Sequence, residues 1–467
     1  MSDVTHALEG MAKEYRETSA PIRFDFKSSC QSILNDNTKK RNGSVHYFHY
    51  YPGRIYPYIP LYLLSLKDFF DCERLIDPFA GSGTVLLEAL INPVKSRSAL
   101  GVEINPLARL ITKTKTTPLD RNRLFGYLWR IEKCYDGISS GHDEIPGSSA
   151  IFLWFSPPAV DGLSKLRKAI KSIEMPVDYR DFFWVCFSAI IRKSSKANPY
   201  IPPPVFLKPE KYKNTGRYAK MLQLVLQSEA PDVPTFFRNT VAANIEKIGF
   251  LERSLIEEQQ EGRVCSLIWD DARSIKKGSL LERGRLNKDG ALAITEGIDL
   301  ILTSPPYLSA QKYVRTSRLE LLWLGFSDEE IRAVEVCSIG TEKVSTRTET
   351  EPFKIVSVDQ LVEKTCSVSS ERGIILFSYF DGMLKSLQEM YRVLKKGGCA
   401  ILVVGNNKVL GEWIDTYALL ADIAISVGFR LILVLRDEIR GRSMMTKRNG
   451  TGGLIKNEFI VVLKKEG

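Results

Sequence analysis

The run Thr303-Ser304-Pro305-Pro306-Tyr307 places a hydroxyl, backbone carbonyls and an aromatic ring side by side. It follows the apolar stretch 298–302, which predicts a buried strand. Two consecutive prolines fix φ and donate no backbone N–H, so the carbonyls of this turn are free to accept hydrogen bonds from a ligand. Open α/β sheets place their active sites at the carboxyl ends of their strands. The run therefore suits a site that holds a planar ring with an exocyclic amino group.

A second run, Asp77-Pro78-Phe79-Ala80-Gly81-Ser82-Gly83-Thr84, begins at the end of another predicted strand, Arg74–Asp77. Gly81 and Gly83 let the backbone approach a ligand closely. They precede a predicted helix, whose N-terminus favours negative charge. A structural turn is the simpler interpretation of two glycines alone, and a phosphate loop is disfavoured because no lysine follows the second glycine. The complete run predicts a cofactor-binding turn.

Together the two runs resemble the signature motifs of S-adenosylmethionine-dependent DNA methyltransferases that act on exocyclic amino nitrogens, as in restriction-modification systems. The Ser-Pro-Pro-Tyr version is the one most associated with methylation of cytosine N4. The resemblance covers the N-terminal third and the C-terminal half of the chain, and the stretch 118–260 carries no motif that we can place. It implies S-adenosylmethionine as the cofactor and double-stranded DNA as the partner.

Two carboxylates follow the predicted second and third strands. Glu103 comes about twenty residues after the glycines, where a carboxylate can accept both hydroxyls of a ribose. An acid that caps the helix after Asn105-Pro106 is the other interpretation. Asp271 resembles the family's contact to the adenine amino group, with Asp270 as a rival and a plain strand-end acid as the alternative.

The segment Tyr51-Pro52-Gly53-Arg54 resembles the part of the family that reaches the methionine end of the cofactor, where Arg54 can pair with the carboxylate. Packing is the alternative, because proline-aromatic loops often do only that. The resemblance implies one set of cofactor-binding residues: Tyr51, Arg54, Asp77, Phe79, Gly81, Ser82, Gly83, Thr84, Glu103, Asp271 and Thr303.

The implied reaction is direct transfer of a methyl group from a sulfonium to an amino nitrogen. Such an amine is a poor nucleophile, because its lone pair is delocalised into the ring. Acceptors that bind its hydrogens can rotate the lone pair out of conjugation and aim it at the methyl group. By resemblance, Ser304 and the carbonyl of Pro305 do this and Tyr307 stacks on the base, so the catalytic set is Ser304, Pro305, Pro306 and Tyr307. The base must leave the duplex to be reached.

Methylation at cytosine C5 is excluded, because it needs a cysteine nucleophile, typically in a Pro-Cys motif, and the chain has no such motif. A third run, Ser156-Pro157-Pro158-Ala159, also places Ser-Pro-Pro after an apolar stretch. It lacks the aromatic residue and precedes the third strand, out of the order that a single sheet needs. We expect it to start a helix, since proline is tolerated in the first turn.

The composition is that of an ordinary globular chain, with 467 residues of which 44% are hydrophobic and 26% charged. The net charge of +10 favours a polyanionic partner, although many basic proteins bind none. The 8 cysteines and 4 histidines lack zinc-site spacing, so we expect no metal and reduced thiols. Neither a secretory signal nor a membrane-spanning apolar stretch is evident, which favours a cytoplasmic protein of prokaryotic type.

The strand and helix patterns predict an α/β fold, a Rossmann-like doubly wound mixed sheet of about seven strands with a mainly helical insertion. The order of strand, glycine turn, helix, strand and acidic end is the first half of such a fold. The later strands are expected at 264–271, 298–302, 400–404, 430–434 and 458–463. The last two suit an antiparallel hairpin at a sheet edge.

Helical periods dominate between 118 and 260, with helices expected near 160–173, 182–192 and 236–258. We expect residues 1–117 and 261–467 to form the catalytic domain. Residues 118–260 are then an inserted, basic region that recognises the DNA target. A basic surface face is the alternative.

Further cations are candidates for phosphate contact. They are Lys312, Arg315 and Arg318 after the catalytic turn, and those of the loop 439–448. For the helix after the catalytic turn and for the loop, core packing or a solvated surface is the alternative.

The sequence therefore predicts a site-specific DNA methyltransferase that acts on N4 of a flipped-out cytosine, in a restriction-modification system that can include a separate endonuclease. Adenine N6 is the runner-up, because the same turn serves either amine. An RNA amino-methyltransferase ranks lower, since no separate RNA-binding module is evident. The intact motifs argue against a catalytically silent nucleic-acid-binding protein.

Overall fold

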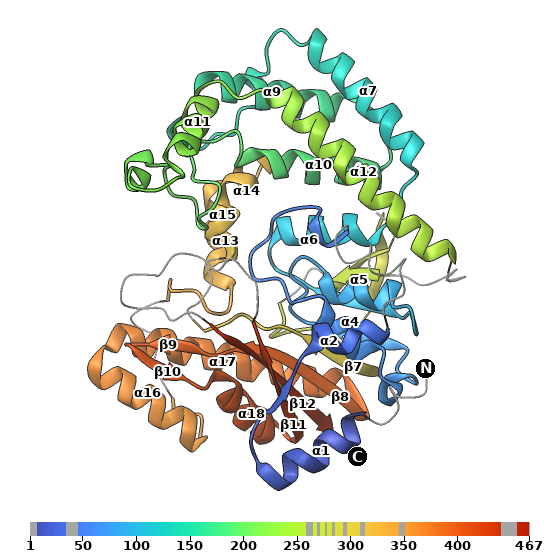
Figure 1. Cartoon of the computed structure of the whole chain (residues 1–467), viewed down its shortest axis with the longest axis vertical. Helices are drawn as coiled ribbons and strands as arrows, with labels where there is room; N and C mark the ends of the chain where they lie inside the picture. The colour runs from blue at the N-terminus through green and yellow to red at the C-terminus, as the bar shows by residue number, and fades with distance from the viewer. Residues whose placement is uncertain are drawn as a thin grey trace.

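The computed structural model describes residues 7–33, 45–257, 265–268, 271–275, 278–282, 285–292, 297–308, 313–344, 351–439 and 455–466. Asp270, Lys312 and residues 440–448 of the basic loop lie outside the described residues. Figure 1 shows a layered α/β part below and a set of long helices above it.

Among the described residues, ten strands form one sheet, in the order β1-β11-β12-β8-β7-β2-β3-β4-β5-β6. The five central strands, from β8 to β4, run parallel to one another, while β12 is antiparallel to both β8 and β11 and β5 is antiparallel to β4. From β2 the chain adds β3 and β4 on one side, and it later adds β7 and β8 on the other. Open α/β sheets bind ligands at such a switch point, outside the carboxyl ends of the strands. The bounds are β1 Ile22–Phe24, β2 Arg74–Asp77, β3 Ser98–Val102, β4 Cys265–Ile268, β5 Gly278–Glu282, β6 Arg285–Leu292, β7 Ile298–Thr303, β8 Leu394–Gly405, β11 Phe429–Glu438 and β12 Asn457–Lys465.

The predicted α/β fold is confirmed. The strands expected from the sequence are β2, β3, β4, β7, β8, β11 and β12, and β2 has the expected bounds. The expected antiparallel hairpin is β11 with β12, and the short β1 pairs outside it. The sequence does not predict β1, β5 or β6, which extend the two edges of the sheet.

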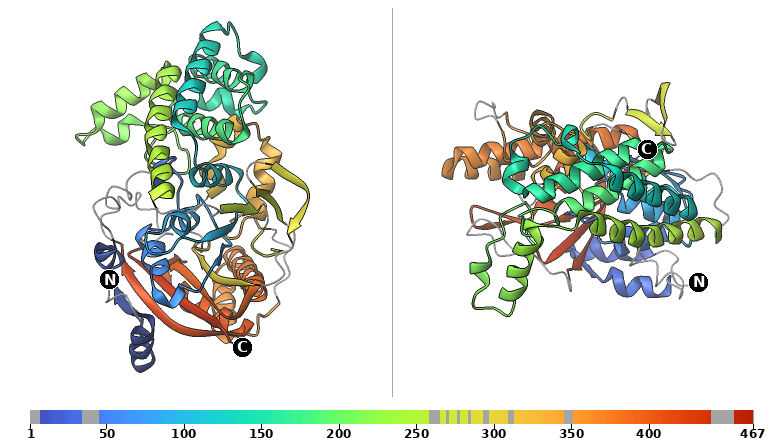
Figure 2. Two further views of the ribbon diagram at one scale, coloured as in Figure 1. Left: turned by 90° about the vertical axis from the view of Figure 1, so that its right-hand side faces the viewer. Right: turned by 90° about the horizontal axis from the view of Figure 1, so that it is seen from above.

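Helices cover both faces of the sheet, as Figures 1 and 2 show. On β8, Ala400, Leu402 and Val404 pack toward α16, α17 and α18, whereas Ile401 and Val403 pack toward the N-terminal helices. A strand segment that is buried on both faces must be apolar at every position, which explains the unbroken hydrophobic run 400–404 of β8.

The helices, short 3-10 turns and remaining strands complete the chain. Their bounds are α1 Ala7–Thr18, α2 Phe26–Ser29, η1 Cys30–Ser32, η2 Val45–Tyr47, α4 Tyr58–Leu64, η3 Lys67–Phe69, α5 Thr84–Ile91, α6 Pro106–Thr116, α7 Arg121–Gly137, η4 His142–Glu144, α8 Ala150–Trp154, α9 Pro157–Ser172, α10 Val177–Ile191, η5 Pro209–Tyr212, α11 Tyr218–Glu229, α12 Val233–Glu257, α13 Tyr313–Thr316, α14 Arg318–Leu324, α15 Asp328–Cys337, α16 Val356–Val368, α17 Ser370–Val393, β9 Asn407–Val409, β10 Glu412–Ile414 and α18 Thr416–Val427.

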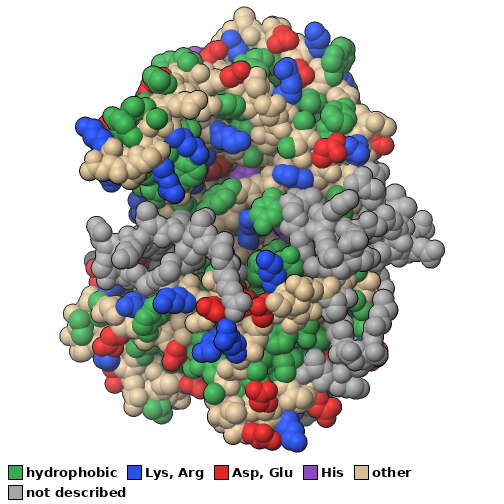
Figure 3. All heavy atoms as spheres, viewed as in Figure 1, with side chains coloured by type: hydrophobic (Ala, Val, Ile, Leu, Met, Phe, Trp, Pro, Cys, Tyr) green, Lys and Arg blue, Asp and Glu red, His purple; other side chains and the backbone are tan. Residues whose placement is uncertain are grey.

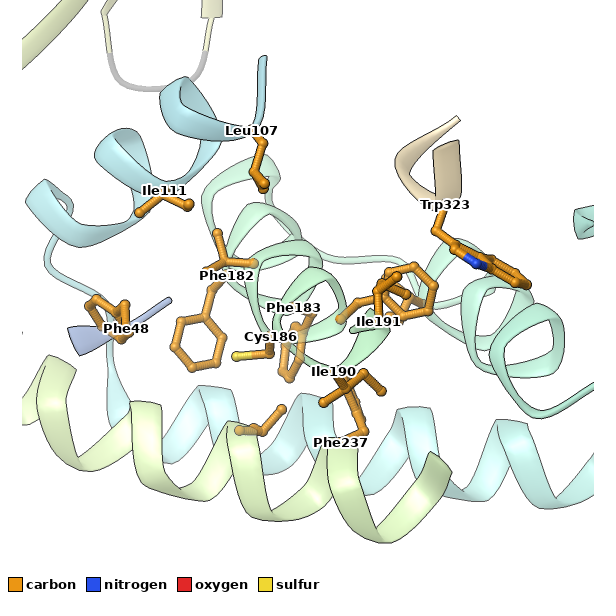
Figure 4. Close-up of a cluster of buried hydrophobic side chains, with 14 of the residues drawn as sticks. Phe48, Leu107, Ile111, Phe182, Phe183, Cys186, Ile190, Ile191, Phe237 and Trp323 are labelled. Atoms are coloured by element: carbon orange, nitrogen blue, oxygen red, sulfur yellow. The ribbon is translucent and has the colours of Figure 1, made fainter. Parts of the chain in front are cut away.

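The long helices α7, α9, α10 and α12 enclose an apolar core of their own. Phe182, Phe183 and Phe237 lie at its centre (Figure 4). The same cluster reaches Leu107 on α6 and Trp323 on α14. The helices of residues 118–260 are therefore packed directly against the part of the chain that carries the sheet.

Ser156 caps α9, with its side chain accepting a hydrogen bond from the backbone N–H of Ala159, and prolines occupy the first turn of that helix. The predicted helix start is thus confirmed. Within the described part of the chain, no helix has the length and apolar character needed to cross a membrane.

Candidate active site

The two sequence motifs meet where β2 and β7 end side by side. The Thr303 hydroxyl, at the end of β7, donates to Oδ1 of Asp77 at 2.5 Å, and the backbone N–H of Phe79 donates to the same oxygen at 3.0 Å. Asp77 is only 2% exposed. Burial raises the pKa of Asp77 to about 7, against the lowering effect of these two donors. Asp77 and Thr303 thus connect the glycine turn to the Ser-Pro-Pro-Tyr turn.

The glycine turn needs both of its glycines. Gly81 and Gly83 have φ values of +52° and +72°, which residues with a Cβ rarely adopt. A Cβ at Gly83 would also collide with the side chain of Thr112 on α6. The Thr112 hydroxyl in turn donates to the Gly81 carbonyl at 2.9 Å. The turn is therefore held close against α6, with Gly81 lining the pocket described below.

Glu103 follows β3 and faces the glycine turn. Its Oε2 accepts from the N–H of Gly81 at 2.8 Å, and its Oε1 accepts from the N–H of Asn105 at 2.7 Å. Burial raises the pKa of Glu103 to about 7, with backbone donors and Arg109 opposing the shift and Asp77 adding to it. Two backbone donors fix the carboxylate, and each oxygen keeps a further lone pair for a ligand hydroxyl.

Asp271 follows β4 and is fixed by Arg273. The backbone N–H and Nε of Arg273 donate to Oδ1 of Asp271 at 2.9 Å and 2.8 Å, and Nη2 donates to Oδ2. Nη2 also donates to the Cys337 carbonyl at 2.6 Å. The Asp271 carboxylate is thus held between the end of a strand and the end of α15.

These groups line one pocket that opens to solvent. Of the residues expected from the sequence, seven line it: Tyr51, Phe79, Gly81, Glu103, Asp271, Ser304 and Pro306.

Five other expected residues lie in or next to the two turns but do not line the pocket. Asp77 and Thr303 brace the two turns, and Ser82 and Gly83 complete the glycine turn. Thr84 begins α5 and is buried.

Arg54 points elsewhere in this structure. Its Nη1 donates to the His46 carbonyl, and its guanidinium carbon lies 4.8 Å from the centroid of the Tyr47 ring. Arg54 is not among the residues that line the pocket. Its expected pairing with a cofactor carboxylate stays a prediction, and it requires that this arginine turn away from the His46 carbonyl.

Gly53, beside Arg54, makes room for the pocket wall. Its φ is +69°, and a Cβ there would lie 2.6 Å from an edge carbon of the Tyr313 ring. Tyr313 lines the pocket next to Tyr51, which is 5% exposed. Burial raises the pKa of the Tyr51 hydroxyl well above its ordinary value, so this group stays neutral.

The Ser-Pro-Pro-Tyr turn has defined donors and acceptors. The Ser304 hydroxyl donates to the Val403 carbonyl of β8 at 3.1 Å, which leaves its oxygen lone pairs to accept. The Tyr379 hydroxyl, from α17, donates to the Pro306 carbonyl at 3.0 Å. Within the part of the chain that the structure describes, no donor reaches the Pro305 carbonyl.

Tyr307 lies against the sheet, beside the pocket lining and not within it. A Cβ at Gly405, the last residue of β8, would lie 2.6 Å from the Tyr307 ring, so the glycine allows this close approach. The Tyr307 hydroxyl donates to Oε1 of Glu458 at 3.2 Å, and Glu458 is 3% exposed on β12. The ring is therefore positioned at one side by a glycine and at its tip by a buried carboxylate.

A second, wider pocket adjoins the first and shares Tyr313, Val314, Ser338 and Ile339 with it. It lies along α13 and α15. Two cations predicted to meet phosphates, Arg315 and Arg318, line it, and Nη2 of Arg318 is paired with Asp328 at 2.6 Å. The two pockets together form a continuous depression beside the Ser-Pro-Pro-Tyr turn.

Several lining residues carry no signal that we could use in the sequence. They are Cys337, Ser338 and Ile339, at the end of α15 and just after it, and Ala272. The nearest hint is Gly340, which has a φ of +81° and lies near the Pro306 side chain and the Tyr307 carbonyl. A single glycine between helices does not reveal such a contact.

The chain is similar to curated proteins named Type II methyltransferases. It is 23% identical to M.MvaI of Kocuria varians over 98% of this chain and 97% of that protein. It is 20% identical to M.BsoBI of Geobacillus stearothermophilus over 84% of this chain and 80% of that protein. A shorter stretch, 33% of this chain and 35% of the relative, is 29% identical to M.AvaI of a Nostoc species. No family model matches the chain. The resemblance to methyltransferases that the two motifs indicate is thus confirmed.

Proposed function

We propose that the protein is a DNA methyltransferase of a restriction-modification system, which transfers the methyl group of S-adenosylmethionine to N4 of a flipped-out cytosine. The observation that carries the proposal is the junction of the two motifs. Asp77 and Thr303 join the glycine turn to the Ser-Pro-Pro-Tyr turn at the switch point of the sheet, and both turns open on one pocket. Similarity to one named Type II methyltransferase along nearly the whole chain supports it.

The pocket suits S-adenosylmethionine. Glu103 offers two carboxylate oxygens, already oriented by backbone donors, to the ribose hydroxyls. Asp271 offers an acceptor to the adenine amino group, and Phe79 and Val102 add apolar surface. Gly81 has no side chain that would fill this space. When bound, the cofactor supplies an electrophilic methyl group on a sulfonium.

The Ser-Pro-Pro-Tyr turn prepares the acceptor amine. The Pro306 carbonyl already accepts a hydrogen bond from the Tyr379 hydroxyl. The Pro305 carbonyl and the lone pairs of the Ser304 oxygen are the acceptors that we propose for the amine hydrogens. When these acceptors bind both amine hydrogens, the nitrogen lone pair rotates out of conjugation with the ring and points toward the methyl group. The two prolines hold the acceptors in place, so the turn needs no reorganisation. Tyr307 offers its ring face to the base. These groups polarise and position the amine.

The remaining elements take the DNA. Residues 118–260 are proposed to be the inserted target-recognition region, and residues 1–117 with 261–467 the catalytic domain. The second pocket, lined by Arg315 and Arg318, is proposed to receive phosphates next to the flipped base. A cognate endonuclease that acts separately on the same sequence is part of this proposal.

The product test uses isotopically labelled S-adenosylmethionine and mixed genomic DNA, followed by digestion to nucleosides and mass spectrometry. Label in N4-methylcytosine is expected. Label in N6-methyladenine would support the proposed mechanism at the Ser-Pro-Pro-Tyr turn but show that the methylated base is adenine and not cytosine. Cofactor binding without label in DNA would overturn the proposal, and label in RNA supplied in parallel would redirect it to an RNA substrate.

Substitution at the turn tests the mechanism. Ser304→Ala is expected to lower kcat by about 100-fold or more while the S-adenosylmethionine Kd changes little, because the serine acts on the amine. The matched control is Ser156→Ala in the second Ser-Pro-Pro run. It removes a helix cap and the hydrogen bond that the buried Ser156 hydroxyl donates to the Ser228 carbonyl, each worth about 1 kcal/mol of stability, and should leave turnover intact. Normal turnover in Ser304→Ala would contradict the catalytic role of this turn.

A further inference from the structure

One segment of the helical part concentrates the positive charge of the molecule. We call residues 193–229 the arm: the chain after α10, then η5, then α11. The arm holds seven cations and two acids, which gives a net charge of +5 out of +10 for the whole chain. The cations are Lys193, Lys196, Lys208, Lys211, Lys213, Arg217 and Lys220, and the acids are Glu210 and Glu229.

Most of these cations lack an acidic partner. The entire arm is described, and within it one ion pair forms, between Nζ of Lys196 and Oε1 of Glu229 at 3.6 Å. The other six cations are exposed, and none of them lies in an ion pair with a described acid. The arm therefore keeps its charge available for an outside anion.

The cations of the neighbouring helices differ from those of the arm in their ion pairing. On α7, α9 and α12, many cations lie in ion pairs with acids of the same helical part, so their charge is already balanced. These paired cations are Arg121, Lys165, Arg167, Lys168, Lys171 and Arg238. The unbalanced charge of the arm is thus a local feature and does not extend evenly over the helices.

The arm is anchored at its base. The backbone N–H of Lys196 donates to the Trp154 carbonyl at 2.8 Å, and the N–H of Leu207 donates to the Lys196 carbonyl at 3.0 Å. The rings of Trp154 and Phe206 stack with centroids 4.2 Å apart. A charged segment fixed in this way loses little conformational freedom when an anion binds.

The arm also projects from the body of the molecule. Figure 2 shows α11 standing out from the other helices in both views. In Figure 3, Lys and Arg side chains gather on the upper left rim of the hollow between the two parts, where Figure 1 places α11. A long polyanion lying along this hollow would meet the arm without entering the catalytic pocket.

We propose that the arm binds the backbone phosphates of duplex DNA beside the target site, and so supplies affinity that does not depend on base sequence. The inference rests on the proposed function. Lysine and arginine side chains that neutralise phosphates release counterions, and each such neutralisation steepens the salt dependence of binding. Interactions of this kind position a protein on the duplex but carry no sequence information themselves.

The test measures binding of the full chain to a labelled duplex of random sequence, by fluorescence anisotropy, over a series of salt concentrations. The test variant carries Lys211→Gln, Lys213→Gln and Arg217→Gln. The slope of log K against log salt should become shallower by about 0.9 for each phosphate that is no longer neutralised, so by about 2 to 3 in this variant. Replacing Lys211 and Lys213 by arginine instead should keep the parent slope.

The matched control removes three exposed cations from α7, on the opposite side of the helical part: Arg123→Gln, Arg130→Gln and Lys133→Gln. The net charge changes equally, so the control should keep the parent slope if position matters and not total charge. Equal slopes for the parent and the arm variant would overturn the proposal. A control slope as shallow as that of the arm variant would overturn it too. A change seen with duplex RNA but not with duplex DNA would overturn the choice of partner.

These outcomes are separate from those for the proposed function. If the parent places no methyl group on DNA, the proposed function fails whatever the salt slopes are. If the parent methylates DNA and the arm variant keeps the parent slope, only the role of the arm fails. Equal thermal midpoints for parent, arm variant and control would establish that all three are folded.

Discussion

At the scale of single residues, the proposed contact of Glu103 with the ribose makes cofactor binding depend on pH. Burial raises the pKa of Glu103 to about 7, so its carboxylate becomes fully ionised only above that value. An ionised carboxylate accepts the stronger hydrogen bonds from ribose hydroxyls. We expect the Kd for S-adenosylmethionine to rise as the pH falls below about 7, by at most about tenfold per pH unit. Calorimetric titration from about pH 8 to about pH 6 measures this.

The stability of the free protein should change in the opposite direction. The unfolded chain loses the proton of this glutamate near about pH 4.3, whereas the folded chain keeps it to about pH 7. The folded state therefore binds more protons between these values, and the stability that this proton confers declines as the pH rises from the lower value to the higher. Glu103→Gln should bind the cofactor more weakly at high pH and lose the pH dependence. A flat affinity in the parent would contradict the assignment.

Tyr307 and Glu458 form a second residue-scale test. Tyr307→Phe keeps the ring but loses the hydrogen bond to the buried carboxylate of Glu458. We expect kcat to fall by about three- to tenfold, since a net hydrogen bond is worth about 0.5–1.5 kcal/mol. Tyr307→Ala should lower kcat much more, because it removes the ring that is proposed to stack on the base.

Glu458 acts in this scheme as a positioning residue. Glu458→Gln should lower kcat by a similar small factor, and the double variant with Tyr307→Phe should be no worse than the more impaired single variant. Additive effects would show that Glu458 does not act through the Tyr307 hydroxyl. The cofactor Kd serves as the control, and it should stay near the parent value in each variant.

The sequence predicts residues of this kind only in part. Tyr307 is predictable because its own motif includes it, and Glu103 because of its distance from the glycines. Glu458 and Tyr379 lie far away along the chain and reach the Ser-Pro-Pro-Tyr turn only because β12 and α17 pack beside it. No local pattern of residues encodes such contacts.

At the scale of elements, Arg97 holds together the connections at the amino end of the sheet. It is fully buried, and its guanidinium donates to four carbonyls, those of Leu64, Phe69, Cys72 and Lys95. Leu64 and Phe69 are the last residues of α4 and η3, where helix carbonyls have no partner within the helix. One arginine thus ties two helices to the start of β2.

Arg97→Lys should destabilise the protein, because an ammonium cannot reach the four carbonyls that a planar guanidinium reaches. Hydrogen bonds to charged groups contribute about 1.5–3 kcal/mol each, so a decrease of about 3 kcal/mol or more in the free energy of unfolding is expected. Urea unfolding followed by circular dichroism measures it. Arg74→Lys, at an exposed position of β2, is the control and should unfold like the parent.

The elements themselves are largely predictable, for physical reasons. Strands such as β2 and β7 are short apolar runs that end in glycine or proline turns, so both their position and their limits are marked. β1 has only three residues and depends on pairing with β11, while β5 and β6 carry mixed polar sequence. Their formation depends on the neighbouring strand more than on their own pattern.

At the scale of the whole molecule, the helical part and the sheet-bearing part share one apolar cluster. Phe187 on α10 lies 6.3 Å from Trp323 on α14, measured between ring centroids, and both are fully buried. Leu107 and Ile111 on α6 belong to the same cluster. Because α6 follows β3 and Glu103, the helical core lies directly behind one wall of the pocket that Glu103 lines.

This shared core predicts that the two parts lose their structure together. Phe187→Ala should cost about 3–5 kcal/mol, the usual range for removing a buried phenylalanine ring. If the parts are coupled, helix content and S-adenosylmethionine binding will fall in one transition at a lower temperature than in the parent. Circular dichroism and cofactor binding, followed over the same temperatures, measure the two signals.

Phe125→Ala provides the comparison, because Phe125 is on α7 in the same helical part but is 44% exposed. Its transition should stay close to that of the parent. A first transition in Phe187→Ala that lowers helix content and leaves cofactor binding intact would show that residues 118–260 unfold on their own. Coupled unfolding would instead mean that whatever holds the helices in place also holds Glu103 and the glycine turn, so that DNA, if the helices bind it as proposed, would stabilise the proposed cofactor site through packing alone.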